Sequence, residues 1–299
     1  MTKKSESTKN SETPKTKSEP KRSLRMMMSV AANPKKQVED RMAALAEVPL
    51  AVCDNENDLQ AVLKIISNQA EPQEVRLAAL QTLQAATFSV VAFESCRSDY
   101  IATLRKVAED PDPELRQRVL GILARENDGF VQKKLIEGLE NPEKALVSPE
   151  KALQLLSYDV HTEAYSIARK IIKDPPNAMA RREALRLLAA DATAAPVFEE
   201  ILRNKTETYE IRQISASALH AVEPEKLQEN ARDILLDASE PDDIQEMSLT
   251  ALTQFGDAAK VSEDKPLLKR VNRLSGNASD AVKQSADQFL DKYLNKDGQ

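Results

Sequence analysis

The chain has 299 residues, of which 41% are hydrophobic, 30% charged and only 4% aromatic, and its formal charge is −6 at pH 7. Six glycines and no tryptophan argue against barrels, sandwiches and nucleotide-binding sheets, because the turns and phosphate loops of those folds consume glycine. No run approaches the roughly 18 apolar residues that a membrane span needs, and the N-terminus lacks the apolar segment of a secretory signal. We therefore expect a soluble, cytoplasmic, all-helical protein that does not contact a membrane.

The first 32 residues are dominated by Ser, Thr, Lys, Glu and Pro, and we expect residues 1–32 to be a disordered tail because this composition cannot bury a core. Residues 1–36 hold ten Lys or Arg against three Glu, a formal +7, which leaves −13 for the other 263 residues of a chain at −6. The apolar cluster Met26–Met28 could dock on a partner or on the body of the protein, or mark the true translation start.

Helical hairpins are predicted for the rest of the chain. Asn33 and Pro34 start a short helix, so residues 33–52 are expected to form an N-terminal capping helix. Residues 53–295 are expected to form about seven antiparallel hairpins, each with an outer helix A and an inner helix B. The A helices are expected to begin near Asn57, Ser98, Asp128, Asp159, Ala195, Pro224 and Lys265, and the B helices near Pro72, Pro113, Pro149, Ala178, Tyr209, Asp242 and Ser279.

The B helices align through one apolar anchor position. The spacing between anchors averages about 34 residues, which is the period of a stacked helical-hairpin array and predicts a right-handed α-solenoid. The anchors are Leu80, Leu120, Leu156, Leu185, Ala216, Leu249 and Ala286.

The clearest repeat runs from Asp110 to Glu126. Asp112 can cap a helix that Pro113 begins, and its apolar residues follow at helical spacing. This segment, D-P-D-P-E-L-R followed by V-L-G-I-L, resembles a HEAT repeat, in a bacterial style similar to the HEAT-like repeats of phycobilin lyases. The resemblance covers roughly residues 33–295 and implies a superhelical fold rather than an activity.

Four B helices carry an arginine four residues before the anchor: Arg76, Arg116, Arg181 and Arg212. The resemblance implies that this arginine pairs with an acid near the turn between helices and so ties neighbouring repeats together. Asp110 and Asp112 are the candidate acids. The equivalent positions in the other three repeats are Ala152, Gln245 and Val282, so we expect the arginine series to be interrupted there.

Six of the seven repeats have an acidic residue six residues before the anchor, and the fourth repeat has Met179 there. The acidic residues, which we call the acidic series, are Glu74, Glu114, Glu150, Glu210, Asp243 and Asp280. We expect these side chains to be exposed on the inner, concave surface. They could simply offset the helix dipole, an effect worth about 0.3 to 1 kcal/mol each. Alternatively, they are candidate partner-binding residues that select a basic protein.

Residues for chemistry are few. His161 and His220 are far apart and match no metal motif, and Cys53 and Cys96 match no ligand spacing, so we expect solvated histidines and reduced thiols. No catalytic residue, cofactor site or metal site is predicted. The acidic body also argues against nucleic acid as a partner, since phosphate binding needs basic residues.

Together these features predict a non-enzymatic HEAT-repeat scaffold that binds a protein partner through the concave face of its inner helices. The resemblance to phycobilin lyases leaves an alternative open, a bilin lyase or chaperone that handles a linear tetrapyrrole.

Overall fold

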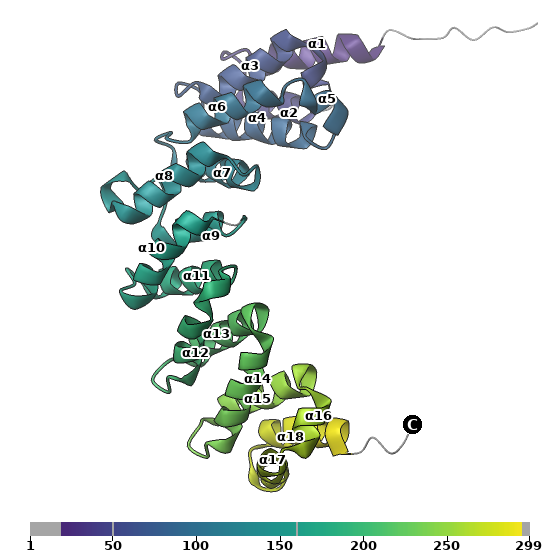
Figure 1. Cartoon of the computed structure of the whole chain (residues 1–299). Coiled ribbons are helices and arrows are strands. Elements are labelled where there is room, and N and C mark those ends of the chain that lie inside the picture. Colours follow the sequence, from purple (N-terminus) through teal and green to yellow (C-terminus); the bar gives the residue numbers. More distant parts are fainter. Residues whose placement is uncertain (1–18, 50, 160, 295–299) are drawn as a thin grey trace, which may run out of the picture. The chain divides into compact units, whose positions relative to one another are not determined.

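The structure, a computed structural model, describes residues 19–49, 51–159 and 161–294. The described residues contain eighteen α-helices, three short 3₁₀ helices and no strand, which confirms the expected all-helical hairpin fold (Figure 1). The chain divides into two compact units, unit 1 with residues 1–123 and unit 2 with residues 124–299. None of the described helices combines the length and the apolar character that crossing a bilayer requires.

Unit 1 contains antiparallel helix pairs. In it α1 packs against α2, α3 against α4, α2 against α4 and α3 against α6, so first helices contact first helices and second helices contact second helices. The elements are α1 (Glu19–Ala31), α2 (Val38–Ala46), η1 (Val52–Asp54), α3 (Glu56–Ser67), α4 (Gln73–Ala86), α5 (Val90–Glu94), α6 (Arg97–Val107) and α7 (Pro113–Arg125), whose last two residues are assigned to unit 2.

The N-terminal domain boundaries expected from the sequence need correction. Residues 19–31 form α1 instead of continuing the tail, and residues 1–18 lie outside the described residues. Met28 and Ala31 are 5% and 0% exposed, because residues spaced by three and four share the face of α1 that meets α2. The expected capping helix is therefore α2, the second helix of a complete pair.

The cysteines also differ from expectation. Cys53 and Cys96 form a disulfide with their Cα atoms 6.0 Å apart, so no thiol among the described residues is free. Cys53 lies in η1 just before α3, and Cys96 lies just before α6. Because α3 and α6 are neighbours in one layer, the turns that precede them meet. Since disulfides persist mainly in oxidising compartments, the cysteines no longer support a cytoplasmic location.

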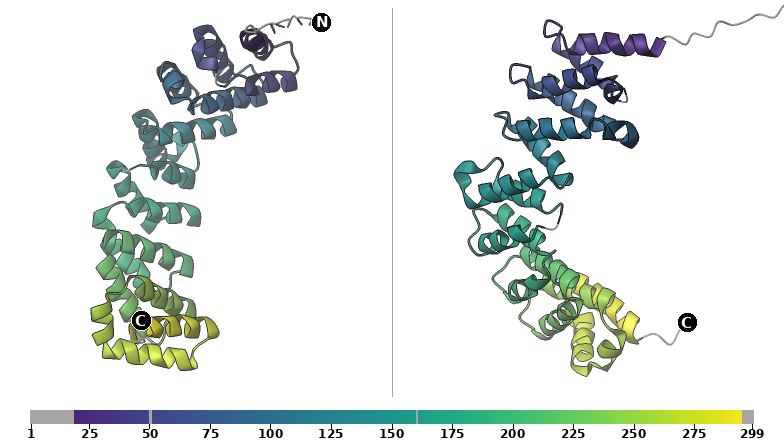
Figure 2. Two further views of the ribbon diagram at one scale, coloured as in Figure 1. Left: turned by 90° about the vertical axis from the view of Figure 1, so that its right-hand side faces the viewer. Right: turned by 45° about the horizontal axis from the view of Figure 1, so that its top comes forward.

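Unit 2 repeats the hairpin several times, and Figure 2 shows its successive pairs from two sides. Its elements are α8 (Gly129–Glu140), η2 (Pro142–Lys144), α9 (Pro149–Leu156), α10 (Thr162–Lys173), α11 (Ala178–Leu188), η3 (Ala192–Ala194), α12 (Ala195–Arg203), α13 (Tyr209–Val222), α14 (Pro224–Leu236), α15 (Asp242–Phe255), α16 (Ala258–Glu263), α17 (Lys265–Asn277) and α18 (Asp280–Leu294).

The helices of unit 2 lie in two layers. We call the first helices α8, α10, α12, α14 and α17 the A layer, in which α8 contacts α10, and α14 contacts both α12 and α17. The second helices α9, α11, α13, α15 and α18 contact one another in sequence order and form the B layer. Each helix thus packs against the other helix of its pair and against up to two helices of its own layer, and α13 also contacts α14 of the next pair.

The apolar anchors occupy the core. All seven predicted anchors are buried, and the most accessible of them, Ala216, is only 6% exposed. The α-helices at the predicted B positions begin within one residue of the predicted starts, as at Pro113, Pro149 and Ala178. Helical periodicity and capping residues are therefore sufficient to locate the repeated helices.

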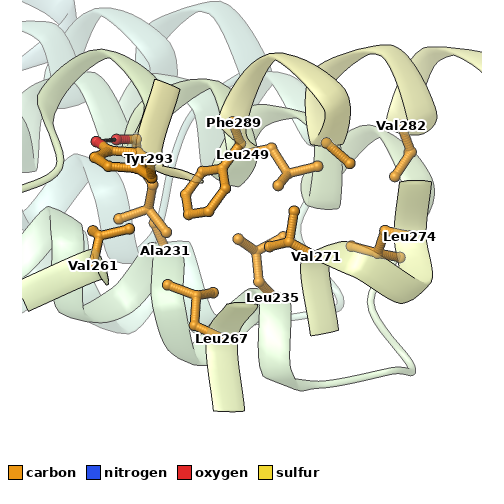
Figure 3. Packing of buried hydrophobic residues seen from close by; sticks show 12 residues of the cluster. Ala231, Leu235, Leu249, Val261, Leu267, Val271, Leu274, Val282, Phe289 and Tyr293 are labelled. Carbon is orange, nitrogen blue, oxygen red and sulfur yellow. Dashed lines mark hydrogen bonds between the residues drawn. The ribbon is translucent and has the colours of Figure 1, made fainter. Parts of the chain in front are cut away.

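The last repeats close on an apolar cluster contributed by α14 to α18 (Figure 3). Phe289 and Tyr293 of α18 enter this cluster, and the Tyr293 hydroxyl donates to the carbonyl oxygen of Leu252 at 2.6 Å. Gly256 ends α15 beside this hydroxyl. A Cβ atom at Gly256 would lie 2.6 Å from the Tyr293 oxygen and 2.4 Å from the Leu252 oxygen, so the close packing requires glycine.

Candidate partner-binding face

The arginine series joins consecutive repeats in unit 1. The Nη1 and Nη2 atoms of Arg76 lie 3.1 and 2.5 Å from the two carboxylate oxygens of Asp110, in the turn before α7. Its Nε donates at 2.9 Å to the carbonyl of Ile66, the penultimate residue of α3. One buried side chain thus satisfies the end of its own first helix and binds the turn of the next repeat.

The same arrangement recurs in unit 2. Arg181 makes a bidentate contact with Glu207, at 2.6 and 2.7 Å, and its Nε donates to Ile172, the penultimate residue of α10. Arg212 pairs with Glu240 at 2.7 Å, and its Nε donates to the carbonyl of Leu202 in α12. The Arg212 and Glu240 side chains are only 1% and 3% exposed.

The predicted residues Arg116 and Asp112 make hydrogen bonds in the turn before α7. Arg116 donates from Nη1 to the carbonyl of Asp110 at 2.6 Å, within the turn before its own helix. Asp112 accepts from the Leu115 amide at 2.7 Å and so caps α7, while the ion pair with Arg76 involves Asp110.

Gln245 occupies the arginine position on α15, and a residue from the next repeat replaces the missing contact. Arg270 of α17 donates from Nε to the carbonyl of Leu235, the penultimate residue of α14, at 2.8 Å. Its Nη2 donates to Gln245 at 3.1 Å, and Gln245 donates to the carbonyl of Glu240 at 2.6 Å. At the other interrupted positions, Ala152 and Val282 are buried and apolar.

These contacts shift the pKa values of the charged groups. Burial acts to raise the pKa of Asp110, but hydrogen bonds from Arg76 and from the Asp112 amide, together with the charges of Arg76 and Arg116, lower that pKa below its usual value. Hydrogen bonding to Glu207 raises the pKa of Arg181 against the opposing effect of burial. Asp110 and Arg181 therefore stay ionised at neutral pH.

The acidic series lies in the first turns of the B helices, where a negative charge interacts favourably with the helix dipole. In unit 1, Glu74 and Glu114 are exposed, and Glu114 pairs with Arg118 at 2.7 Å.

In unit 2, Glu150 is half-buried and accepts from Asn177 at 3.2 Å. A hydrogen bond from Ser148 is the main cause of a lowered pKa at Glu150. Glu210 is exposed and pairs with Arg182 of the preceding B helix at 2.5 Å, while Asp243 and Asp280 are exposed in their first turns.

Three neighbouring B helices present matching exposed positions. On α13, Glu210, Ile214 and Ser217 follow at i, i+4 and i+7, so they lie along one side of the helix. The residues at the same spacing are Met179, Glu183 and Arg186 on α11, and Asp243, Met247 and Thr250 on α15. We call these nine residues the B face, and all of them are exposed or half-buried.

A hollow of about 390 Å³ lies between α11 and α13 within this face. Ala189, Ile214, Ser217 and Ala218 line it with small and aliphatic groups, and Arg186 and Gln213 complete the lining. Small side chains on both helices leave this space. Shape and polarity suit it to bind a side chain.

The histidines contribute no metal site. Among the described residues, no group of three or more His, Cys, Asp and Glu could hold a metal ion. His161 lies just before α10, and His220 stacks on Phe255 of α15 with ring centroids 3.9 Å apart. His220 therefore helps to join two B helices at the end opposite the acidic series.

Several contact residues were not predicted from the sequence. Arg41 of α2 lies four residues before the buried Leu45, and it binds Glu71 at 2.6 Å and the carbonyl of Ala31. This spacing is the same as in the other repeats and could have identified an additional hairpin. The acids Glu207 and Glu240 have no such signal, because their separation from the arginine differs between repeats.

Comparisons with known proteins show little. No protein-family model matches the chain, and no curated protein matches it. Among solved structures, one of human deoxyhypusine hydroxylase in complex with glycerol matches at 15% identity and a TM-score of 0.34, covering 83% of this chain and 100% of that one. A likeness at this level carries no argument about activity.

The comparison nevertheless corrects one expectation. The chain was expected not to be an enzyme, whereas the similar structure is that of an enzyme. Absence of catalysis is therefore not a property that can be assigned to this chain.

Proposed function

We propose that the chain is a HEAT-like repeat protein that binds a protein partner through the B face of unit 2. The observation that carries this proposal is the regular B face, in which three adjacent helices present side chains at matching positions around a hollow. The paired helices and the recurring arginine contacts support the HEAT-like assignment, which the sequence alone suggested through the segment from Asp110 to Glu126.

The physical basis is repetition. Each B helix is held to the next by contacts that lie on its buried side, such as Arg181 with Glu207, so the exposed side is free to vary. Stacked helices then offer a partner many similar positions at fixed spacing. A partner can bind several of them at once, which gives affinity from individually weak contacts.

Crosslinking in the native host cell tests this proposal. A photoreactive amino acid is placed at Ser217 on the B face and, in a separate variant, at the exposed Ser166 on α10 of the A layer. Ultraviolet irradiation and mass spectrometry then identify what is attached to each variant. We expect the same protein to be captured repeatedly from position 217 and not from position 166.

A control for folding accompanies this experiment. Melting temperatures of both variants must match that of the unmodified chain, so that misfolding is excluded. Equal capture from both positions, or no reproducible protein from position 217, would contradict the proposed site. No observation in the described residues favours the alternative of a bilin-handling protein.

A further inference from the structure

We infer that the B face recognises a basic segment that carries an aliphatic side chain, which enters the hollow between α11 and α13 while neighbouring lysines or arginines contact Glu210 and Asp243. This inference rests on the proposed function, since it specifies the chemistry of the partner at the same face.

The lining of the hollow determines the first half of the ligand. Ile214, Ala189 and Ala218 present carbon atoms, and Ser217 adds one hydroxyl at the surface. These carbon atoms favour an aliphatic side chain, which loses water contact and gains packing against them. The hollow also opens to solvent along the helices, which suits a side chain that projects from a longer segment.

Charge determines the second half. The helix α15 contains Asp242, Asp243 and Glu246 and has no Lys or Arg within its bounds. On α13, the basic residue Arg212 is buried and paired, while Glu210 is exposed.

Two basic residues of α11 are already paired, Arg182 with Glu210 and Arg186, which lines the hollow, with Glu183. Since Arg182 balances Glu210, the negative charge of this face comes mainly from the acidic residues of α15, and it is complementary to a basic segment.

The two features are adjacent on one side of the same helix. Glu210 lies four residues before Ile214, and residues at this spacing are neighbours on a helix surface. Asp243 and Met247 have the same relation on α15. A segment that places an aliphatic group against Ile214 therefore brings its flanking cations within reach of the carboxylates.

The N-terminal residues of the chain are basic but lack the second feature. Residues 1–18 contain five lysines, and their only long apolar side chain is Met1. A separate protein segment with both features is thus the proposed occupant, and residues 1–18 serve as a comparison.

Fluorescence anisotropy with synthetic peptides tests the inference on the full chain. The probe is a labelled lysine–serine peptide with one central leucine. Its comparators replace leucine with glycine, replace every lysine with glutamate, or reproduce residues 1–18. We expect the probe to bind roughly tenfold or more tightly than the glycine comparator, because leucine burial is lost there. The glutamate comparator should show no binding, and the peptide of residues 1–18 should bind no better than the glycine comparator.

Matched variants locate the binding. Ser217→Trp fills the hollow, and Ser166→Trp adds the same group on α10. Glu210→Lys with Asp243→Lys reverses the charge on the B face, and Glu163→Lys with Glu229→Lys makes the same net change on the A layer. Each B-face variant should weaken the probe roughly tenfold, the charge variant less so as salt is added, and the A-layer variants should leave binding unchanged. Melting temperatures confirm that each variant is folded.

The outcomes separate this inference from the proposed function. Equal binding of leucine and glycine peptides, loss of binding in the A-layer variants, or tighter binding of residues 1–18 overturns the inference. Crosslinking from position 217 does not depend on the charge or apolarity of the partner. Its success together with peptide failure would leave the B face as a protein-binding site for a different kind of segment.

Discussion

The two units join their repeats by the same arginine contact, but only unit 1 adds a covalent bond. In unit 1, the Arg76–Asp110 pair is accompanied by the Cys53–Cys96 disulfide. In unit 2, the pairs of Arg181 and Arg212 are followed by a repeat in which Arg270 replaces the contact from the next helix.

The disulfide lies beside the least covered part of the described chain. Phe88 lies before α5 and is 87% exposed, and Val91 lies in its first turn and is 92% exposed. The helix α5 is only five residues long. Phe93 anchors this helix through an edge-to-face contact with Tyr100, with ring centroids 5.4 Å apart. The comparison indicates that an arginine contact suffices where regular pairs stack, and that a crosslink supplements it where an irregular segment interrupts them.

The largest effect should come from breaking a buried pair. Glu240→Ala leaves Arg212 charged and buried, and Asp110→Ala does the same to Arg76, so each should lower the free energy of unfolding of its unit by about 3–5 kcal/mol. The free energy of unfolding of each unit is measured by denaturant titration with amide exchange as the readout. Asp233→Ala, which breaks an exposed pair with Arg203, should cost under about 1 kcal/mol. A similar loss of unfolding free energy in all three variants would show that burial does not determine how much these pairs contribute to stability.

Reduction of the disulfide should affect unit 1 alone. The bond joins residues separated by 43 positions. Closing a loop of this length lowers the entropy of the unfolded chain and so stabilises the folded state by about 4 kcal/mol. With reductant, or in the Cys53→Ser variant, amide exchange in α3 and α6 should accelerate, while α10 to α15 serve as the internal control. Unchanged exchange in α3 and α6 would mean that packing alone holds η1 to α6.

A smaller effect is expected from Arg270→Ala. The change removes hydrogen bonds to the Leu235 carbonyl and to Gln245, and two such bonds to a charged donor are worth about 2–3 kcal/mol when half-buried. The double variant Arg270→Ala with Gln245→Arg restores an arginine at the usual position. Thermal unfolding should show partial recovery in the double variant, and no recovery would contradict the interpretation that Arg270 replaces the missing residue.

The smallest effect is the dependence on acid. Because the pKa of Asp110 is lowered in the folded state, its contribution to stability is fully present above its unfolded pKa of about 4 and is lost as the pH falls through the folded pKa. Asp191 of unit 2 also has a lowered pKa, with burial opposed by bonds from Thr193 and Arg169. Unfolding titrations below about pH 4 should show a shallower slope in Asp110→Asn. An unchanged slope would show that the Asp110 carboxylate does not contribute to the pH dependence of stability.

Much of the fold follows from local patterns in the sequence. The anchors Leu120 and Leu185 are buried as expected, and proline or capping residues locate the helix starts. The helix α1 was missed because its segment is polar on average, although Met28 and Ala31 are buried. Average composition does not reveal one narrow apolar face.

The contacts between repeats could not be predicted for a different reason. The arginine and its acid are 34 residues apart for Arg76 and 26 for Arg181, since turns differ in length, and no fixed offset finds the acid. The disulfide and the role of Arg270 depend on which turns and helices become neighbours. The hollow depends on Ala189 and Ser217, whose small size becomes meaningful only when α11 and α13 are side by side.

Through the Arg181–Glu207 and Arg212–Glu240 pairs, the hairpin α12–α13 has a property that α3–α4 shares through Glu71 and Arg76. It accepts an arginine in its own turn and supplies an arginine to the next turn, so its two ends are chemically compatible with each other. A tandem copy of this hairpin would find a carboxylate for each guanidinium, and the array could lengthen by gene duplication at this place. The hairpin α14–α15 lacks this property, because the Leu235 carbonyl depends on Arg270 of the following helix. Growth of the array is therefore expected to be tolerated before Pro224 and resisted after it.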